Sequence, residues 1–323
     1  MNSSLDYVKK IAEDIKSLKI QGATAVAISA LNALKLFVEK SPEKNFLQDL
    51  NSAIKFLINS RPTEPAMQNG IRFIKYHLNQ AREENKTISG IKETIKQASE
   101  SYINMLEEAT KKVVKFGWKR IPDDGVIMTH CHSSVVVNIL KAAKDNGKKF
   151  IVVNTETRPL YQGRKTARRL AEYGIKVYHV VDSGMRWIAR KLKPDMALIG
   201  SDAISSTGVI INKIGSKLLA LVANEFDFPF YVASTLLKFD ASTLFGEYIP
   251  IEMRDVKEVW PDAPEGVTIL NPAFETVDPK YIDGIITESG VIPPEHVLES
   301  FMDTYPNIWQ GIYQEIMKIR KEL

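Results

Sequence analysis

The stretch 125–134, GVIMTHCHSS, joins a short apolar run to a polar turn and decides the fold class of the chain that follows it. Its apolar half, 126–128, has the length of a buried strand and is too short for a helix. Its polar half contains Cys131, the only cysteine of the chain, and the apolar run 135–137 then opens a helical pattern. The stretch therefore predicts a strand, a polar turn and a helix start, the arrangement in which open α/β sheets bind ligands.

The same alternation continues through the rest of the chain. Further apolar runs predict strands at 150–153, 177–181, 196–199, 228–232 and 282–287. Helical patterns lie between and after them, at 134–146, 163–173, 184–192, 214–226 and 295–302, with one more at the end of the chain. Residues 209–211 are expected to form a small hairpin arm, and 240–281, rich in Pro, Asp and Glu, to be irregular. Repeated strand–helix units predict a parallel sheet with right-handed crossovers.

The first third of the chain has a different pattern, with apolar residues at steps of three and four. It predicts helices at 4–18, 25–40, 46–59, 66–81 and 88–116, and no strand before about residue 124. The fold class is therefore α/β, with an N-terminal helical domain over 1–120 and a Rossmann-like, mostly parallel sheet domain over 121–323.

Composition excludes several classes of protein. The 323 residues carry a net charge of +4 without a Lys/Arg block, so we expect no direct nucleic-acid partner. A single cysteine fits a reducing cytoplasm, and no apolar run approaches the roughly 18 residues of a membrane span. No dinucleotide or P-loop glycine motif is present, and His130 and His132 have no second ligand cluster, so no metal is expected.

Four motifs carry a resemblance to a known family. They are THCHS at 129–133, GSDAI at 200–204, INKIGS at 211–216 and NPAF at 271–274. Together they resemble the ribose-1,5-bisphosphate isomerase family, which belongs with methylthioribose-1-phosphate isomerases and the alpha, beta and delta subunits of translation initiation factor two-B. The resemblance implies an aldose–ketose isomerase that converts α-D-ribose 1,5-bisphosphate to D-ribulose 1,5-bisphosphate in AMP breakdown. It also implies no cofactor, AMP as a possible activator, and a homo-oligomer, a dimer or a hexamer built as a trimer of dimers.

The resemblance implies that Cys131 is the base and Asp202 the acid. A thiolate can take the C2 proton if N–H dipoles or cations lower its pKa, and a carboxyl can donate near neutral pH if burial raises its pKa. Without the motifs, Cys131 reads as a small buried hydrophobe and Asp202 as a turn or cap residue. His130 and His132 either tune the thiol or pack in the core.

The resemblance also implies a set of substrate contacts for the two phosphates. They are Gln21, Gly22, Ala23, Thr24, Arg61, Ser133, Ser134, Val135, Asn212, Lys213 and Lys238. Lys213 stands before the helix 214–226, whose N-terminus also attracts anions. Ser133 and Ser134 are equally suited to capping the helix that follows them.

Two departures favour a different function. Gln21 stands where isomerases of this superfamily carry arginine, and Glu64 stands where they carry an apolar residue. These residues suit a non-catalytic regulatory subunit, related to the initiation-factor subunits, that senses a nucleotide or sugar phosphate. A third possibility is an isomerase of methylthioribose 1-phosphate, which needs the same acid and base but only one phosphate site.

Overall fold

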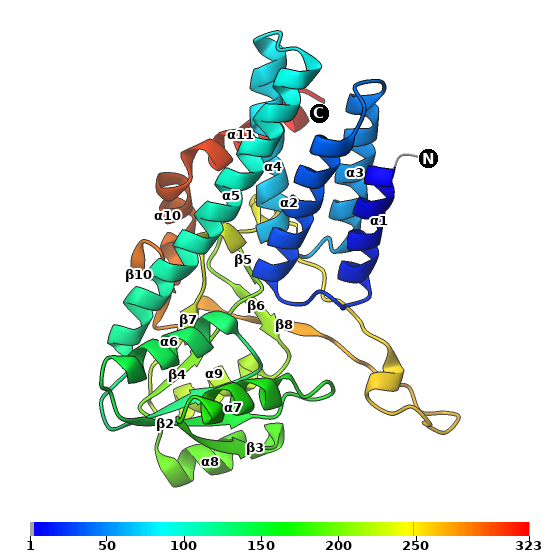
Figure 1. The fold of residues 1–323 in the computed structure, drawn as a ribbon. Coiled ribbons are helices and arrows are strands. Elements are labelled where there is room, and N and C mark those ends of the chain that lie inside the picture. Colours follow the sequence, from blue (N-terminus) through cyan, green and yellow to red (C-terminus); the bar gives the residue numbers. More distant parts are fainter. Residues whose placement is uncertain (1–2, 248, 323) are drawn as a thin grey trace. The chain divides into compact units, whose positions relative to one another are not determined.

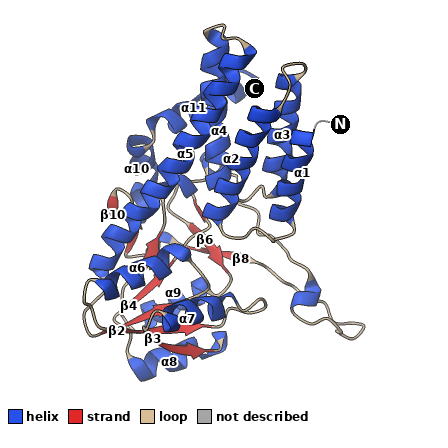
Figure 2. Ribbon diagram, viewed as in Figure 1, coloured by secondary structure: helices blue, strands red, loops and turns tan. Residues whose placement is uncertain are grey.

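The computed structural model describes residues 3–247 and 249–322 and divides into two compact units (Figures 1 and 2). The helical unit comprises Met1–Glu108, Leu237–Ala241 and Glu299–Leu323, and the α/β unit comprises Ala109–Leu236 and Ser242–Leu298. The chain therefore crosses between the units several times, whereas the sequence suggests one boundary near residue 120.

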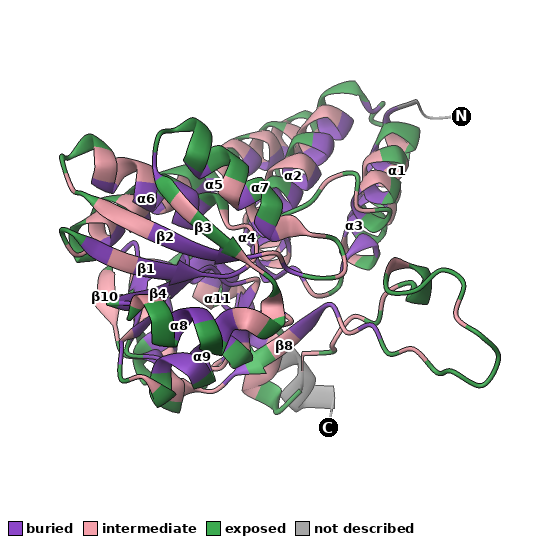
Figure 3. Ribbon diagram, turned by 90° about the horizontal axis from the view of Figure 1, so that it is seen from below, coloured by how far each residue is buried: buried purple, intermediate pink, exposed green. Residues whose placement is uncertain are grey.

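The helical unit contains the expected N-terminal helices, with ends within two residues of the predicted ones. They are α1 (Ser3–Lys16), α2 (Ala23–Lys40), α3 (Phe46–Ser60), α4 (Pro65–Glu83) and the first part of α5 (Ile88–Gly117), joined by most of α10 (Val297–Thr304) and by α11 (Pro306–Glu322). Buried residues recur at steps of three and four along α1 to α4, as a period of 3.6 residues requires, and Figure 3 shows buried and exposed residues alternating along α1. Among the described residues, no helix combines the length and the apolar character of a membrane span.

Helix α4 explains why later segments join the helical unit. The buried amide of Asn69 donates to the carbonyls of Leu237 and Phe239, at 2.9 and 2.8 Å. Helix α11 packs on α4, where Arg72 Nε lies 3.1 Å from Glu315 Oε2. Long-range contacts of this kind leave no periodic signal in the sequence.

The end of α5 belongs to the α/β unit for a similar reason. Val113 is fully buried in the hydrophobic cluster that also contains Ile127 and Ile139. A Cβ on Gly117 would lie 2.5 Å from Ile139 Cδ1, so this glycine allows α5 to approach α6 (Ser134–Asp145) closely. The α/β unit therefore begins at Ala109, inside a continuous helix.

The main sheet of the α/β unit has seven strands in the order β10-β9-β7-β4-β1-β2-β3. They are β1 (Gly125–Thr129), β2 (Phe150–Thr155), β3 (Lys176–Val180), β4 (Met196–Ile199), β7 (Phe230–Ala233), β9 (Gly284–Thr287) and β10 (Gly290–Ile292). All neighbouring pairs are parallel except β9 and β10. The Rossmann-like, mostly parallel sheet is thereby confirmed, and β10 is an antiparallel edge strand that the sequence reading missed.

Helices cover both faces of this sheet. Helices α6 and α7 (Gln162–Glu172) lie on one face, and α8 (Met185–Leu192) and α9 (Ser216–Glu225) lie on the other (Figure 3). The central strands β1, β4 and β7 are almost entirely buried, which is why they read as unbroken apolar runs.

A second, three-stranded antiparallel sheet has the order β5-β6-β8, with β5 at Ala203–Ile204, β6 at Ile210–Lys213 and β8 at Phe274–Val277. The expected hairpin arm is the β5–β6 pair. The expectation of irregular structure throughout 240–281 is wrong at β8. That strand has only four residues and forms by pairing with β6, about sixty residues earlier, so its own sequence does not announce it.

Candidate active site

The order of strands creates a topological switch point between β1 and β4. From β1 the chain moves outward to β2 and β3, and it then returns to the other side of β1 as β4. Ligands of open α/β sheets bind at such a point, outside the carboxyl ends of the two strands. Cys131 follows β1 and Asp202 follows β4, so the topology brings the two predicted catalytic residues to the same edge of the sheet, at its switch point.

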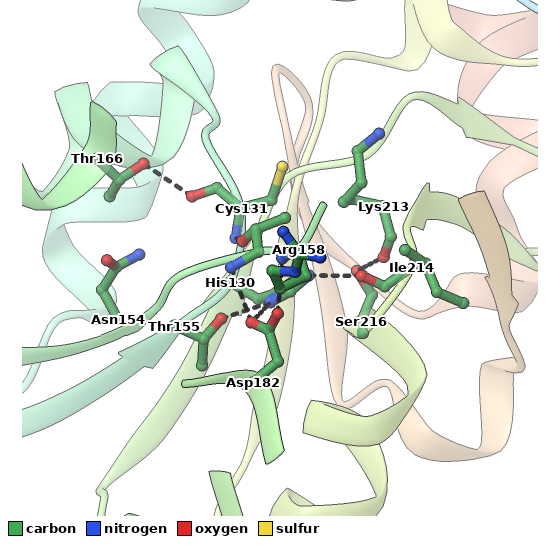
Figure 4. A network of polar contacts seen from close by, with 12 residues as sticks. His130, Cys131, Asn154, Thr155, Arg158, Thr166, Asp182, Lys213, Ile214 and Ser216 are labelled. Atoms are coloured by element: carbon green, nitrogen blue, oxygen red, sulfur yellow. Dashed lines mark hydrogen bonds and ion pairs between the residues drawn. The ribbon is translucent and has the colours of Figure 1, made fainter. Parts of the chain in front are cut away.

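Electrostatics supports this convergence. Burial raises the pKa of Cys131 to about 11, the Lys213 ammonium lowers it, and the negative charges of Asp202 and Asp182 raise it further. Figure 4 shows the sulfur of Cys131 on the side of the site that carries Lys213. In the chain without substrate, desolvation outweighs the nearby cation, so the thiol does not have the pKa near neutrality that a free thiolate base requires.

The backbone of Cys131 has a left-handed conformation, with φ at 65°. Its N–H donates to Thr157 Oγ1 at 3.0 Å, and its carbonyl accepts from Thr166 Oγ1 at 2.8 Å. Both polar groups of the residue are thus satisfied by threonine hydroxyls from other elements, one from the loop after β2 and one from α7.

His130 is a structural histidine held at both ring nitrogens. Its Nε2 must donate to the carbonyl of Ile214, 2.7 Å away, because a carbonyl only accepts. Burial lowers the pKa of His130, so the ring is neutral at pH 7 and its Nδ1 accepts from Thr155 Oγ1 at 2.5 Å. The ring therefore joins the end of β2 to the turn before α9 and has no nitrogen left for proton transfer (Figure 4).

His132 has one nitrogen engaged. The hydroxyl of Thr166 gives its proton to the carbonyl of Cys131, so His132 Nδ1 must donate to Thr166 Oγ1 across 2.9 Å. Burial and then the charges of Lys165 and Arg169 lower the pKa of His132 to about 4. This ring is neutral over the physiological range.

The INKIGS motif shapes the site around His130. Gly215 has φ of 103°, and a Cβ there would lie 2.6 Å from His130 Cε1, so only glycine permits this approach. Lys213 belongs to β6 itself, only 7 % exposed, with Nζ 4.5 Å from the centre of the Phe274 ring on the paired strand. Asn212 donates to Ser216 Oγ at 2.8 Å, which ties the strand to the first turn of α9.

The N-terminus of α9 already holds an anion from the chain. One oxygen of the Glu275 carboxylate accepts from the N–H groups of Gly215 and Lys217, at 2.5 and 2.9 Å. The expected anion at this helix terminus is therefore a carboxylate of the chain itself, which occupies these two N–H groups. The sequence could not show this, because Glu275 lies on β8, whose pairing was not predicted.

The N-terminus of α6 is different. Ser133 caps it, accepting from Val136 N at 3.4 Å, as one of the two expected roles requires. Ser134 is exposed and Val135 packs its side chain in the core, so Val135 could contact a ligand only through its backbone. Over the described chain, no hydrogen bond from the N–H of Ser134 or Val135 to a protein acceptor is recorded.

The remaining predicted contacts belong to the helical unit. Gly22, with φ of 90°, precedes α2, which begins with Ala23 and Thr24, while the exposed Gln21 donates to a backbone carbonyl at 2.7 Å. Arg61 is only 9 % exposed, and its Nε lies 3.1 Å from Glu64 Oε1.

Lys238 ends a short 3-10 helix in the helical unit and is 7 % exposed. It is thus a nearly buried cation, whereas lysine side chains are mostly exposed.

Sequence reasoning missed three residues that support Cys131. Thr157 follows β2, Thr166 lies on α7, and Asp182 follows β3. Asp182 accepts from the N–H groups of Thr157 and Arg158, at 2.8 and 2.7 Å. The available signal was the position of Thr157 and Asp182 directly after predicted strands, the same position as that of Cys131.

No cluster of three or more His, Cys, Asp or Glu side chains suited to a metal ion occurs within residues 3–247 and 249–322. The polar groups around Cys131 are the hydroxyls of Thr157 and Thr166, the ammonium of Lys213 and the carboxylates of Asp182 and Asp202. Of these groups, Lys213 and the hydroxyls suit an anionic organic ligand.

Comparisons with known proteins agree with this architecture. A model of the Initiation factor 2 subunit family (IF-2B) matches residues 19–294. A ribose 1,5-bisphosphate isomerase from Pyrococcus furiosus is 39 % identical over 95 % of this chain and 96 % of its own length. A methylthioribose-1-phosphate isomerase from Desulforamulus reducens is 32 % identical over 88 % of this chain and 86 % of its own.

A solved structure of the translation initiation factor eIF-2B from Pyrococcus horikoshii OT3 has a TM-score of 0.78 and 29 % identity, covering 90 % of this chain and 98 % of that one. The resemblance inferred from the four motifs is therefore confirmed over most of the chain. On the match of its sequence to the family model and to relatives well above 30 % identity, the chain belongs to the Initiation factor 2 subunit family.

Proposed function

We propose that this protein isomerises α-D-ribose 1,5-bisphosphate to D-ribulose 1,5-bisphosphate, with Cys131 as base and Asp202 as acid. The observation that carries the proposal is the position of these residues after β1 and β4, on either side of the switch point. The names of relatives that are 34–39 % identical, all ribose 1,5-bisphosphate isomerases, support the choice of substrate.

The raised thiol pKa defines how the base must form. With a pKa of about 11, Cys131 is protonated at pH 7. Transfer of its proton to the Asp202 carboxylate creates the thiolate base and the carboxylic acid in one step. This transfer only moves a negative charge from one side chain to its neighbour, whereas loss of the proton to water would add a negative charge to the site. A bound bisphosphate, itself negative, therefore opposes the transfer less than it opposes loss of the proton to water.

The reaction then balances with these two groups alone. Asp202 gives its proton to the ring oxygen as the C1–O bond breaks, and Cys131 removes the C2 proton, which leaves an enol phosphate across C1 and C2. Cys131 returns its proton to C1, and the Asp202 carboxylate takes the proton of the C2 hydroxyl as the ketone forms. Cys131 ends as the thiolate and Asp202 as the carboxylic acid, and return of the proton from Asp202 to Cys131 restores the resting pair. The steps move protons only, so no redox cofactor is needed.

Within the α/β unit, two features suit a phosphate. The N–H groups of Ser134 and Val135 open the twelve-residue helix α6, whose dipole favours an anion. The ammonium of Lys213 provides a positive charge close enough to lower the pKa of Cys131. We assign the contacts of the other phosphate to Gln21, Thr24, Arg61 and Lys238 as expectations from the family alone.

The test is an assay of purified protein with ribose 1,5-bisphosphate, with and without AMP as the proposed activator, and NMR identification of the product. Cys131→Ser and Asp202→Asn should each lose product formation by more than about 100-fold, the scale of acid–base catalysis, while still binding substrate. Methylthioribose 1-phosphate serves as the competing substrate. Full activity of either variant would exclude its assigned role.

A second candidate function has one observation in its favour. Arg61 is nearly buried against Glu64, so much of its positive charge is compensated within the helical unit. This arrangement suits a regulatory subunit that senses a nucleotide or sugar phosphate. It predicts an inert wild-type protein and a Cys131→Ser variant that binds nucleotide as well as the wild type does.

A homo-oligomer, a dimer or trimer of dimers, is part of the proposal. The segment 252–273 leaves the α/β unit as an extended arm (Figure 1), with Met253, Trp260 and Leu270 exposed by 57, 46 and 74 %. Large apolar side chains exposed together suit a contact with a second copy. Light scattering should show an oligomer for the wild type and dissociation for Trp260→Glu with Leu270→Glu. An unchanged mass would exclude the arm from the contact.

A further inference from the structure

Two residues of the site have a backbone conformation that residues with a Cβ usually avoid. Cys131 and Thr157 have φ of 65° and 63°, and they follow the neighbouring parallel strands β1 and β2. The left-handed conformation costs roughly 1–2 kcal/mol for such residues. Conformations of this kind persist only where surrounding contacts hold them, and they concentrate at functional sites.

The contacts that hold Cys131 are two hydroxyls, which we call the hydroxyl clamp. Thr157 Oγ1 accepts from the N–H of Cys131 at 3.0 Å, and Thr166 Oγ1 donates to its carbonyl at 2.8 Å. The two peptide planes that flank the residue are therefore both fixed. The Cα–Cβ bond, and with it the range of positions open to the sulfur, follows from those planes.

The clamp is itself supported from the next strand. The Asp182 carboxylate, after β3, accepts from the N–H groups of Thr157 and Arg158, at 2.8 and 2.7 Å. On the other side, Thr166 Oγ1 also accepts from His132 Nδ1 at 2.9 Å. Hydrogen bonds thus connect the ends of β3, β2 and β1 in sequence. Such a network serves to keep one geometry among several that the loops could adopt.

We propose that Thr157 and Thr166 are positioning residues that hold the sulfur of Cys131 toward the switch point between β1 and β4. The proposal rests on the proposed function, because the sulfur must face the substrate only if it transfers the C2 proton. Without the clamp, the Cys131 peptide relaxes to a right-handed or extended conformation, and the sulfur turns away from the substrate carbon. A displacement of about 1 Å at a reacting group can cost a factor of about 100 in rate.

The first experiment compares valine and serine at both positions. Thr157→Val and Thr166→Val keep the shape of the side chain but lose the hydroxyl, and the serine variants keep the hydroxyl. The matched control is Thr94→Val, which removes a hydrogen bond of 3.0 Å to the carbonyl of Gly90 inside α5, in the helical unit. We expect the clamp valine variants to lose about 10- to 100-fold in kcat with KM nearly unchanged, and serine to restore it.

The second experiment needs no isomerase activity. Because the chain has one cysteine, iodoacetamide labelling reports on Cys131 alone. Loss of either clamp hydroxyl should change the labelling rate at fixed pH by more than about threefold, since both the access and the solvation of the thiol change. The serine variants and Thr94→Val should label at the wild-type rate. Circular dichroism and thermal unfolding verify that each variant is folded, and an alanine variant replaces any valine variant that is not.

The outcomes separate the two proposals. Wild-type kcat and labelling in both valine variants would overturn the clamp, as would serine variants that are as impaired as valine. A loss of thermal stability with unchanged kcat would also overturn it, since the hydroxyls would then be structural only. If the wild-type protein does not isomerise ribose 1,5-bisphosphate, the proposed function fails, and the labelling rates alone decide whether the clamp holds the thiol.

Discussion

The ionisation of Cys131 gives the sharpest quantitative prediction. Burial raises the pKa of its thiol from the ordinary value of 9.0 to about 11. A pKa two pH units higher corresponds to about 2.7 kcal/mol against the thiolate. At pH 7.5 an ordinary cysteine is roughly 3 % thiolate, and Cys131 should be roughly 0.03 %, a difference of about 100-fold in reactive species.

The assay is the pH dependence of iodoacetamide labelling, which reports on this one thiol. Since only the thiolate reacts, the logarithm of the rate should rise by about one unit per pH unit up to about pH 11. The same chain in denaturant is the control, and its rate should level off near pH 9. The slope of the logarithm of the labelling rate against pH distinguishes a raised pKa from steric protection of the thiol. Steric protection lowers the labelling rate by the same factor at every pH.

Charge variants test the cause of the shift. Lys213→Met removes the cation that lowers the pKa of Cys131, so labelling at pH 9 should slow down. Asp202→Asn removes a negative charge that raises this pKa, so labelling should accelerate. A folded wild-type protein whose labelling rate levels off at or below pH 8 would contradict the raised pKa, because the thiol would then be activated before substrate binds.

Three further predictions concern stability. Gly215→Ala should lower Tm and cost about 1–3 kcal/mol, because a Cβ would meet the His130 ring at a positive φ; an unchanged Tm would contradict the close approach. Glu64→Ala should lower the free energy of unfolding in urea by about 3 kcal/mol or more, because it removes the carboxylate beside the nearly buried Arg61. The companion Glu64→Gln should lower it less, and equal losses in the two variants would argue against a charge effect. Asn69→Leu should cost about 1–3 kcal/mol by the same measurement, since two backbone carbonyls lose their donor, and a smaller loss would show that water replaces it.

Local pattern was sufficient for most of the secondary structure. The helices α1 to α5 have one apolar stripe each, and the parallel strands are short apolar runs buried on both faces, so their sequences carry the burial directly. The strand-end positions of Cys131 and Asp202 follow from the same pattern. Their role in chemistry came from motif resemblance, since a lone cysteine or aspartate after a strand has several ordinary explanations.

Pairing between distant segments was beyond the sequence. The four residues of β8 form a strand only because β6 lies beside them, and that pairing puts the Glu275 carboxylate at the start of α9. The two partners of His130 and the two hydroxyls on Cys131 likewise come from other elements. No periodicity within one segment encodes such contacts, because they depend on how the ends of separate strands meet.

Local pattern in the sequence predicted the helices and the parallel strands of the main sheet, together with the two residues that follow its central strands, but not β8 or β10. The electrostatics of the site, including the thiol pKa of about 11, depend on the folded arrangement of distant residues. The physical reason is that hydrophobic periodicity records which face of a segment is buried, whereas a pKa depends on how deeply one atom is desolvated and which charges surround it. Those distances exist only once the chain has folded.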